Sequence, residues 1–467
     1  MIILLSIYGL AILYLSQAIV YLFQIKEYRI DRTLSQIRED GLLPLIIKYV
    51  GRRAAISPRN ILIVGLQIVA LIVTWFAAQS LLEEVLLFPI IGVLSSIFGV
   101  IATEPLAKMR RKKLIEDAMT KVSQSRAIFI GISGTYGKST TKEYLYHILS
   151  QKFQVARTDD NMNTDVGVAV SILRNLKPDT EFFVAEVGAY RPGEVKSASA
   201  IFKPTFAIMV PFGNQHMGLF GSKDTLVAAE SEILDLIPPD GKVYVNADIA
   251  EFDYVKNKTQ SHVDSYSIVR KDADIFADEI KTGERGSVAR VHYNNKSFEI
   301  STKLLGKHVI QNMLPAIAIA IDAGMNHEEV ADAITHLNYI PGKLSLQQKN
   351  EAVIINDSGN SNLNGFLAAI DTLKLFNRDE NYILSKGIIE LGNEKADSYK
   401  KIVMQIESAN FKLVTTDKLF KQFDSKNIVT IVHNESGLYS YIVSKLNAKT
   451  ALLLEGKFSK KFVNKFV

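Results

Sequence analysis

A glycine-rich segment that ends in Lys-Ser-Thr has the residue types needed to bind a nucleotide phosphate. The segment reads GISGTYGKSTT over residues 131–141; an apolar run over residues 127–132 leads into it, and helical spacing follows over residues 139–149. Glycines let backbone N–H groups converge on phosphate oxygens, and a helix N-terminus adds a favourable dipole. Lys138 can reach the β- and γ-phosphates, and the Ser139 hydroxyl can ligate Mg²⁺. The pattern therefore favours a nucleotide site over an ordinary strand–turn–helix connection.

This loop is not a standard Walker loop, because Ile132 stands where the strict pattern has a glycine. The short form GTxGK[ST]T is found in Mur ligases, the ATP-dependent amino acid and peptide ligases of cell-wall synthesis. From about Ala127 to the C-terminus the chain resembles that family, and most closely the type that adds D-alanyl-D-alanine to a muramoyl peptide. Further segments resemble family motifs in the same order: residues 161–167, 186–194, 216–222, 306–312, 357–362 and 390–392.

The resemblance implies a reaction with ATP and Mg²⁺ as cofactors. ATP would phosphorylate a substrate carboxylate, and an incoming amine would attack the acyl phosphate to give an amide, ADP and phosphate. The nucleotide site would comprise Gly134, Thr135, Gly137, Lys138, Ser139, Thr140, Asn312, Lys343 and Asp357. The catalytic residues would be Lys138, Glu186, His216 and Glu230, and the Mg²⁺ ligands Ser139, Glu186, His216 and Glu230. The substrates would lie near Asn161, Asn163, Thr164, Asn360 and Asn362.

Several of these positions depart from the family pattern or have ordinary structural alternatives. Outside the motif context, Glu186 and His216 would be a solvated carboxylate and a capping or core histidine. Glu230 stands where the family has a carbamylated lysine, and glutamate is anionic at neutral pH without modification. We hypothesise that Glu230 replaces the carbamate; the alternative is a solvated residue and a lost function. Lys343 replaces an arginine, which keeps the charge but loses bidentate phosphate binding.

The C-terminal motifs depart further from the family. Gly359 stands where the family has tyrosine, and the pair at residues 386–387 is Lys-Gly where the family has Gly-Asp. These changes leave the identity of the incoming amine open.

The elements that position these residues have an α/β pattern. Short apolar runs at residues 182–187, 205–210 and 242–246 alternate with helical stretches such as residues 226–236 and 308–323. A second series follows a break at residues 340–342, with strands expected at residues 352–356, 382–384, 411–415 and 428–432. Such alternation favours mainly parallel sheets. We expect a central P-loop ATPase domain over residues 108–338 and a Rossmann-like α/β domain over residues 339–467, with residues 338–344 as the hinge that the resemblance implies.

The first 107 residues are expected to form a helical membrane anchor. Uncharged stretches at residues 2–23, 61–82 and 85–102 are close to the roughly 20 residues that a span needs, with Glu83 and Glu84 as the turn between the last two. A signal peptide is the alternative for the first stretch, but it has no basic n-region. Basic residues gather between residues 26 and 59 and between residues 108 and 113. The positive-inside rule then predicts a multi-pass cell-membrane protein, with its N-terminus outside and its catalytic domains in the cytoplasm.

Residues 42–50 are apolar with one lysine, and they form either an interfacial helix or a loop helix packed on the spans. The composition agrees with a two-part chain. A mean hydropathy of +0.11 averages an apolar part and an ordinary one, and the net charge of +5 is concentrated beside the spans. The chain has no cysteine, which excludes a disulfide scaffold, cysteine-ligated zinc, an iron–sulfur cluster and a cysteine nucleophile.

The predicted partners follow from the anchor and the resemblance. Such ligases begin with a soluble domain that binds a uridine-diphosphate sugar, and here apolar spans take that place. Either the muramoyl-peptide-like acceptor is attached to a membrane lipid, or the anchor recruits the enzyme to a cell-wall synthesis complex. The amine would be an amino acid or dipeptide, and the basic clusters would face membrane lipids rather than nucleic acid. A capsule or poly-γ-glutamate ligase and an inactive nucleotide-binding scaffold are the rival interpretations.

Overall fold

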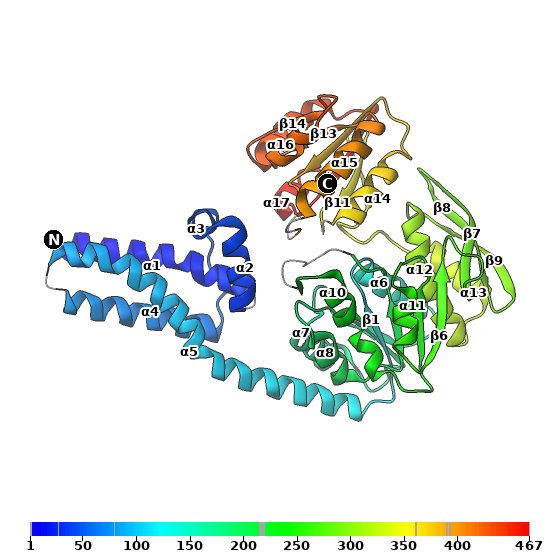
Figure 1. The fold of residues 1–467 in the computed structure, drawn as a ribbon, viewed down its shortest axis with the longest axis horizontal. Helices are drawn as coiled ribbons and strands as arrows, with labels where there is room; N and C mark the ends of the chain where they lie inside the picture. The colour runs from blue at the N-terminus through cyan, green and yellow to red at the C-terminus, as the bar shows by residue number, and fades with distance from the viewer. Residues whose placement is uncertain are drawn as a thin grey trace. The chain divides into compact units, whose positions relative to one another are not determined.

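The computed structural model describes residues 2–26, 28–78, 80–213, 220–359, 362–388, 391 and 394–466 (Figure 1). It separates into two compact units, Met1–Glu116 and Asp117–Val467.

The first unit is helical. Its helices are α1 (Ile2–Ile25), α2 (Ile30–Asp40), α3 (Leu42–Tyr49), α4 (Pro58–Ala77) and α5 (Leu81–Ser123), the last of which continues past the unit boundary. Among the described residues, three helices are long and apolar enough to cross a membrane: Ile7–Ile25, Pro58–Ala77 and Val85–Ser123. The expected number of spans agrees with this finding, which rests on length and composition.

The turn between the second and third spans lies earlier than expected. The sequence suggested a span to residue 82 and an acidic turn at Glu83 and Glu84, but α4 ends at Ala77 and α5 begins at Leu81. The Ser80 hydroxyl accepts a hydrogen bond from the Glu83 backbone N–H (3.2 Å), so Ser80 caps α5. Acidic side chains in the first turn of a helix interact favourably with the helix dipole. Glu83 lies in the first turn of α5 and not in the connection between the two helices. The same helix continues beyond residue 102 and through the basic residues 108–113.

Helix α3 has a packed side and an exposed side. Leu45 is fully buried, and the rings of Tyr49 and Tyr21 lie 5.5 Å apart. Leu43 and Ile47 are 68% and 66% exposed. One side of this short helix is therefore packed, as expected of a loop helix, and the other side leaves apolar residues exposed, as expected of an interfacial helix.

Polar side chains and small residues join the long apolar helices. Gln17 Nε2 donates to Gln67 Oε1 (3.1 Å), and Gln67 Nε2 donates to Ser96 Oγ (2.5 Å). A Cβ added to Gly92 would lie 2.8 Å from a methyl carbon of Ile12, so α1 and α5 approach closely there. Close approach at small residues and hydrogen bonds between helices are the usual means by which spans associate.

The second unit begins with a large sheet. Over the described residues it has nine strands in the order β2-β3-β1-β4-β5-β6-β7-β8-β9, parallel up to β7 and antiparallel from β7 to β9. The strands are β1 (Ile128–Ser133), β2 (Val155–Arg157), β3 (Phe182–Glu186), β4 (Phe206–Met209), β5 (Lys242–Asn246), β6 (His262–Ser267), β7 (Ile275–Gly283), β8 (Gly286–Tyr293) and β9 (Lys296–Thr302). The mainly parallel sheet is confirmed, whereas the antiparallel extension was not predicted.

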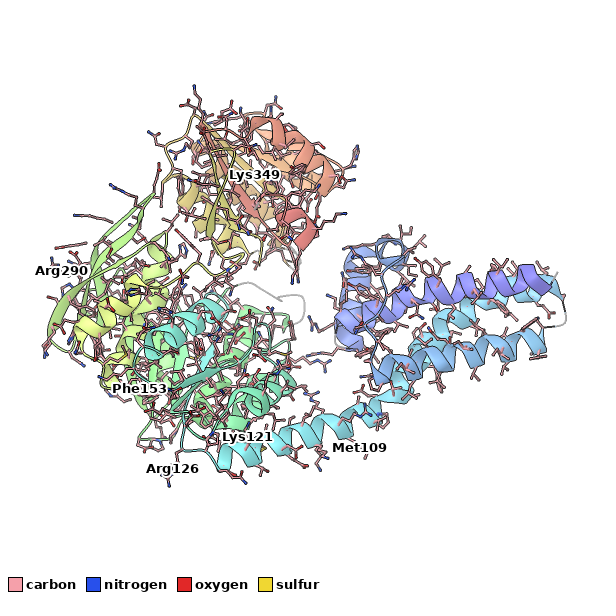
Figure 2. All side chains as sticks on the ribbon, turned by 180° about the vertical axis from the view of Figure 1, so that it is seen from behind. Met109, Lys121, Arg126, Phe153, Arg290 and Lys349 are labelled. Atoms are coloured by element: carbon pink, nitrogen blue, oxygen red, sulfur yellow. The ribbon has the colours of Figure 1, made fainter. Side chains whose placement is uncertain are left out.

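Most helices of this first sheet region lie between its parallel strands in the chain, and the last two, α12 and α13, come after β9. They are α6 (Lys138–Leu149), α7 (Asp165–Asn175), α8 (Glu194–Phe202), α10 (Lys223–Glu230), α11 (Phe252–Asn257), α12 (Lys307–Asp322) and α13 (His327–Thr335). The single helix expected over residues 226–236 is α10 followed by a 3-10 helix, η1 (Ser231–Leu236). Lys121, which Figure 2 labels near the end of α5, donates a hydrogen bond to the Leu173 carbonyl oxygen in α7 (2.7 Å).

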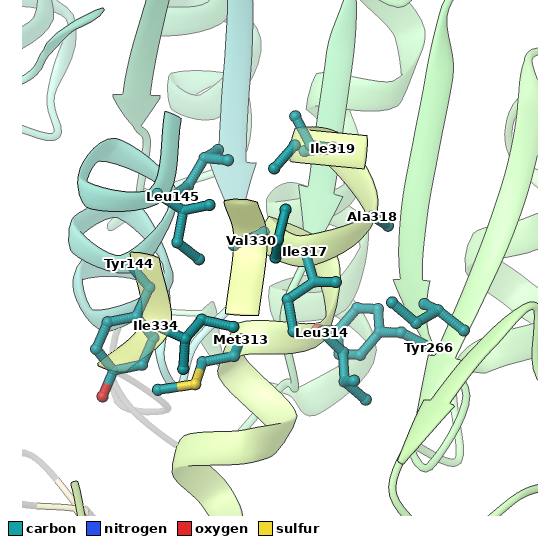
Figure 3. Close-up of a cluster of buried hydrophobic side chains, with 14 of the residues drawn as sticks. Tyr144, Leu145, Tyr266, Met313, Leu314, Ile317, Ala318, Ile319, Val330 and Ile334 are labelled. Atoms are coloured by element: carbon teal, nitrogen blue, oxygen red, sulfur yellow. The ribbon is translucent and has the colours of Figure 1, made fainter. Parts of the chain in front are cut away.

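The core beneath the phosphate-binding segment joins α6 to α12 and α13 (Figure 3). Tyr144 and Leu145 of α6 and Met313, Leu314 and Ile317 of α12 belong to one cluster of buried side chains. Because α12 packs directly against α6, this apolar contact fixes the helix that starts at Lys138.

A second sheet follows, with six strands among the described residues in the order β10-β11-β15-β12-β13-β14. Its strands are β10 (Ser345–Lys349), β11 (Ala352–Asp357), β12 (Glu380–Ser385), β13 (Lys412–Thr415), β14 (Val429–Ile431) and β15 (Thr450–Glu455). All are parallel except β10, which pairs with β11 in the antiparallel direction. Its helices are α14 (Leu363–Leu373), α15 (Lys395–Ser408), α16 (Glu435–Ile442) and α17 (Lys460–Val463), with 3-10 helices η3 (Lys418–Phe423) and η4 (Val443–Lys445).

Candidate functional site

The candidate site lies where the adjacent strands β3, β1 and β4 end. Ile132 pairs with Glu186, and Ser133 pairs with Met209, so these strand ends lie side by side. The carboxyl ends of parallel strands are the usual place for ligands in an α/β sheet. The glycine-rich loop leaves β1 at this edge and leads into α6.

Two glycines give the loop its shape. Gly134 and Gly137 have φ angles of 115° and 91°, a region that residues with side chains rarely adopt. A Cβ on Gly134 would collide with the Val210 carbonyl oxygen, and one on Gly137 would lie 2.6 Å from Asn312 Oδ1. The loop therefore needs both glycines, and Asn312 of α12 packs directly against it.

The loop directs its backbone N–H groups in two ways. The N–H groups of Thr135 and Tyr136 donate to the Pro211 carbonyl oxygen at 3.0 and 2.9 Å, which anchors the loop to the end of β4. Gly137 provides no side-chain cap for α6. The first N–H groups of the helix, which include those of Ser139 and Thr140, are thus placed to receive an anion such as phosphate.

Lys138 and Glu230 are joined beneath this loop. Lys138 Nζ donates to the Gly134 carbonyl oxygen and lies 3.5 Å from Glu230 Oε1. Glu230 is only 4% exposed, and its Oε2 accepts hydrogen bonds from Ser133 Oγ (2.7 Å) and Gly134 N–H (3.2 Å). Glu230, at the end of α10, therefore holds both the start of the loop and its lysine.

Glu186 ends β3, and only one of its two carboxylate oxygens accepts a hydrogen bond from the described residues. Its Oε1 accepts from Asn163 Nδ2 (3.2 Å). Its Oε2 is buried and has no hydrogen-bond partner within the described part of the chain, and the same holds for Thr135 Oγ1 in the loop. A buried polar atom without a partner is unfavourable and calls for an explanation. A carboxylate oxygen is a ligand that Mg²⁺ prefers, so this site fits the ion.

The sequence suggested no role for Lys142, which is fully buried near the start of α6. Its Nζ donates to the Thr158 carbonyl oxygen (2.9 Å) and lies 4.0 Å from Glu186 Oε2. Its place in the loop motif was visible in the sequence, but its carboxylate neighbours were not.

Burial lowers the pKa of Lys343, while the nearby carboxylate of Glu186 opposes that shift and nearby Lys142 adds to it.

The expected metal ligands are only partly described. His216 lies outside the described residues. Among the residues that are described, no three His, Cys, Asp or Glu side chains gather as a metal cluster. Glu186 and the Ser139 hydroxyl remain as groups that could hold a cation at this edge.

The expected substrate residues take different positions. Asn163 contacts Glu186, and Asn161 has a positive φ of 60°. Thr164 caps α7 by accepting from Gly167 N–H (3.3 Å), and Asn362 caps α14 in the same way. Asn360 lies outside the described residues. The side-chain oxygens of Thr164 and Asn362 are thus already engaged in capping.

Asp357 ends β11 beside Glu455, which ends the neighbouring strand β15. Burial raises the pKa of Asp357 to about 6, against the lowering effect of its hydrogen bonds with the Glu455 side chain and the Leu344 backbone. Leu344 N–H donates to Asp357 Oδ1 (3.2 Å), so this carboxyl group fastens the segment that joins the two sheets.

Residues 132–320 match the family described as the Mur ligase middle domain. Residues 132–320 therefore form a Mur ligase middle domain. The matched stretch of this Mur ligase domain contains most of the loop together with Glu186, Glu230 and Asn312. Asp357, Lys343 and the second sheet lie beyond it.

Curated relatives are similar to this chain in sequence, and solved structures share its fold. The UDP-N-acetylmuramoyl-tripeptide--D-alanyl-D-alanine ligase of Borreliella burgdorferi is 29% identical over 309 residues, which cover 64% of this chain and 64% of that protein. The chain spans less than two thirds of the length of such curated relatives. MurF from Acinetobacter baumannii shares the fold, with a TM-score of 0.69 and 22% identity over 76% of this chain and 80% of that one. MurF from Thermotoga maritima, solved in complex with ADP, has a TM-score of 0.68 and 19% identity over 74% and 80%.

Proposed function

We propose that the chain is a membrane-anchored, ATP-dependent amide ligase of the Mur type. It would activate a carboxylate as an acyl phosphate and join it to an amine. The observation that carries the proposal is the buried Glu186 Oε2, which accepts no hydrogen bond from the described residues, beside a glycine-rich loop within a Mur ligase middle domain. A carboxylate oxygen that accepts no hydrogen bond and lies next to a phosphate-binding loop is suited to a nucleotide-bound cation.

In this proposal the loop binds the ATP phosphates and Lys138 neutralises their charge. Ser139 and Glu186 would hold Mg²⁺, which supplies further charge neutralisation at the transferred phosphate. Glu230 would support the ion through the loop that it holds, and His216 is a further proposed ligand. Asn312 lies against Gly137, where it could orient the nucleotide relative to the loop. Asp357 and Lys343 would contribute from the segment that precedes the second sheet.

The proposed acceptor is a muramoyl-peptide-like carboxylate, and the proposed amine is an amino acid or dipeptide. The names of the relatives, which specify a muramoyl tripeptide and D-alanyl-D-alanine, support this substrate class. The three apolar helices support an acceptor that is linked to a membrane lipid. Basic residues beside the spans favour an N-terminus outside and a ligase in the cytoplasm. Recruitment to a cell-wall synthesis complex is the alternative use of the anchor.

The test uses the full chain in lipid nanodiscs with ATP, Mg²⁺ and candidate amines. Mass spectrometry of the products identifies the amide, and phosphate release reports turnover. We expect turnover with a polyprenyl-linked muramoyl peptide and little with the nucleotide-linked one. The opposite preference would remove the lipid-linked acceptor while leaving the ligase proposal intact.

A nucleotide-binding scaffold without turnover is the second candidate. One observation favours the scaffold: Lys138 Nζ already contacts the Gly134 carbonyl oxygen and the Glu230 carboxylate. Lys138 would have to leave both contacts to bind a phosphate group. Comparing the wild type with Lys138→Ala separates the two. A ligase loses turnover by about 100-fold or more when a group that stabilises transferred charge is removed. A scaffold shows the same background rate for both proteins.

A further inference from the structure

Lys142 is the buried charge that the proposed reaction does not use. Lysine is almost never fully buried unless its charge is paired, because removing an ammonium group from water is costly. Here the side chain is fully buried. Its Nζ lies 3.4 Å from Glu143 Oε1, 3.8 Å from Asp160 Oδ1 and 4.0 Å from Glu186 Oε2. Three carboxylates therefore balance the ammonium group, and one of them is the proposed Mg²⁺ ligand.

The hydrogen bonds around Lys142 join three elements at one point. Lys142 on α6 donates to the carbonyl oxygen of Thr158, the residue after β2. Thr158 Oγ1 accepts from the backbone N–H of Glu186 at the end of β3 (3.1 Å), and Thr158 N–H donates to the Val184 carbonyl oxygen (3.0 Å). The same connection continues to Asn163, which donates to Glu186 Oε1. Both the backbone and the side chain of Glu186 are thus held from the segment that Lys142 fixes.

We propose that Lys142 is a positioning residue that, through Thr158 and the loop bearing Asn163, holds the Glu186 carboxylate in the orientation that binds the nucleotide-bound divalent cation. The inference rests on the proposed function, because it takes Glu186 as a cation ligand. Partners that orient a metal ligand contribute strongly, and their loss weakens metal binding by about 10–100-fold.

Charge neutralisation alone would have the opposite effect. If Lys142 only balanced the carboxylates, its removal would leave a more negative site and the divalent cation would bind more tightly. If it positions Glu186, its removal weakens cation binding. The direction of the change in affinity therefore distinguishes the two roles.

The test measures Mn²⁺ binding to the full chain in detergent, in the presence of a non-hydrolysable ATP analogue, by electron paramagnetic resonance. Lys142→Met keeps the length of the side chain and removes its charge. Lys152→Met is the matched control, since Lys152 is a partly exposed lysine paired with Glu329. We expect the Kd for Mn²⁺ to rise about 10–100-fold in Lys142→Met and to stay unchanged in Lys152→Met. In turnover assays, the Mg²⁺ half-saturation point should rise while the KM for the acceptor stays constant.

Unchanged or tighter Mn²⁺ binding in a folded Lys142→Met protein would overturn the proposal. If that variant shows no cooperative melting transition, Thr158→Val carries the test, because it removes the hydroxyl that holds the Glu186 backbone and leaves the lysine in place. A weakened Mn²⁺ affinity in Thr158→Val supports the proposal, and an unchanged affinity overturns it. Absence of nucleotide-dependent Mn²⁺ binding in the wild type would instead refute the proposed function itself.

Discussion

Gly137→Ala should weaken nucleotide binding for two separable reasons. The φ angle of 91° at this position is left-handed, which costs a residue with a side chain about 1–2 kcal/mol. The new methyl group would also lie 2.6 Å from Asn312 Oδ1, so the amide would have to move. Strain of this size corresponds to about 5–30-fold in affinity if the loop relaxes away from its binding shape.

A double-mutant cycle isolates the contact with Asn312. In an Asn312→Ala background the obstacle is absent, so Gly137→Ala should lose less affinity than in the wild type. Neighbouring residues that share a contact typically couple by about 0.5–3 kcal/mol. We expect a coupling of about 1 kcal/mol, measured from the Kd of a fluorescent ATP analogue for the full chain in detergent.

Gly324→Ala is the matched control for backbone strain. Gly324 has a φ of 98° and no atom within 4 Å of an added Cβ, and it lies between α12 and α13. That substitution should lower thermal stability without changing nucleotide affinity. Strict additivity of Gly137→Ala and Asn312→Ala, or an unchanged affinity in Gly137→Ala, would refute the reasoning.

Three further substitutions test other parts of the chain. Glu230→Ala removes the carboxylate that holds the loop, so ATP turnover should fall about 10–100-fold and the Mg²⁺ requirement should rise; an unchanged rate and Mg²⁺ dependence would exclude a role for Glu230. Gln67→Leu removes the amide that joins the apolar helices, so the free energy of unfolding in detergent should fall by about 1 kcal/mol. An unaltered melting curve would show that the Gln67 hydrogen bonds do not stabilise the helices. Burial raises the pKa of Asp357 from 3.8 to about 6, so the folded chain binds this proton more tightly and loses stability as the pH rises through that window. Asp357→Asn should flatten that part of the thermal stability curve, and an equally steep curve would contradict the assignment.

The parallel strands and the phosphate loop could be predicted because their signals are local. Strands buried on both faces appear as continuous apolar runs, and β1, β3 and β5 lie within one residue of their expected positions. The loop carries its own glycine and lysine spacing. Such features depend only on neighbours in the chain.

The antiparallel extension was missed although its signal is present. Buried and more exposed residues alternate along β8 and part of β9, and Asn294 and Asn295 between them have positive φ angles of 52° and 58°. Two residues of this kind are typical of a tight hairpin turn. The apolar run of β15 was also overlooked, and with it the position of Glu455.

The contacts that define the site could not be predicted, because they join distant residues. Glu230 and Ser133 are 97 positions apart, and their hydrogen bond follows from where α10 packs rather than from any motif. The environment of Lys142 likewise arises when α6, β2 and β3 meet. Sequence shows which residue types are available, while packing decides which of them meet.

The edges of the two sheets bear on how neighbouring copies would behave on a membrane. Confinement to a surface raises the local concentration of a protein, and an unpaired strand edge is a template for joining another copy. Here the edge strands β2 and β14 have only three residues each, and the edge strand β10 has five. The longer edge strand β9 packs against α13 and exposes Lys296 and Glu299. Under the proposed membrane anchoring, these short or covered edges would limit the clustering of neighbouring copies through their sheets.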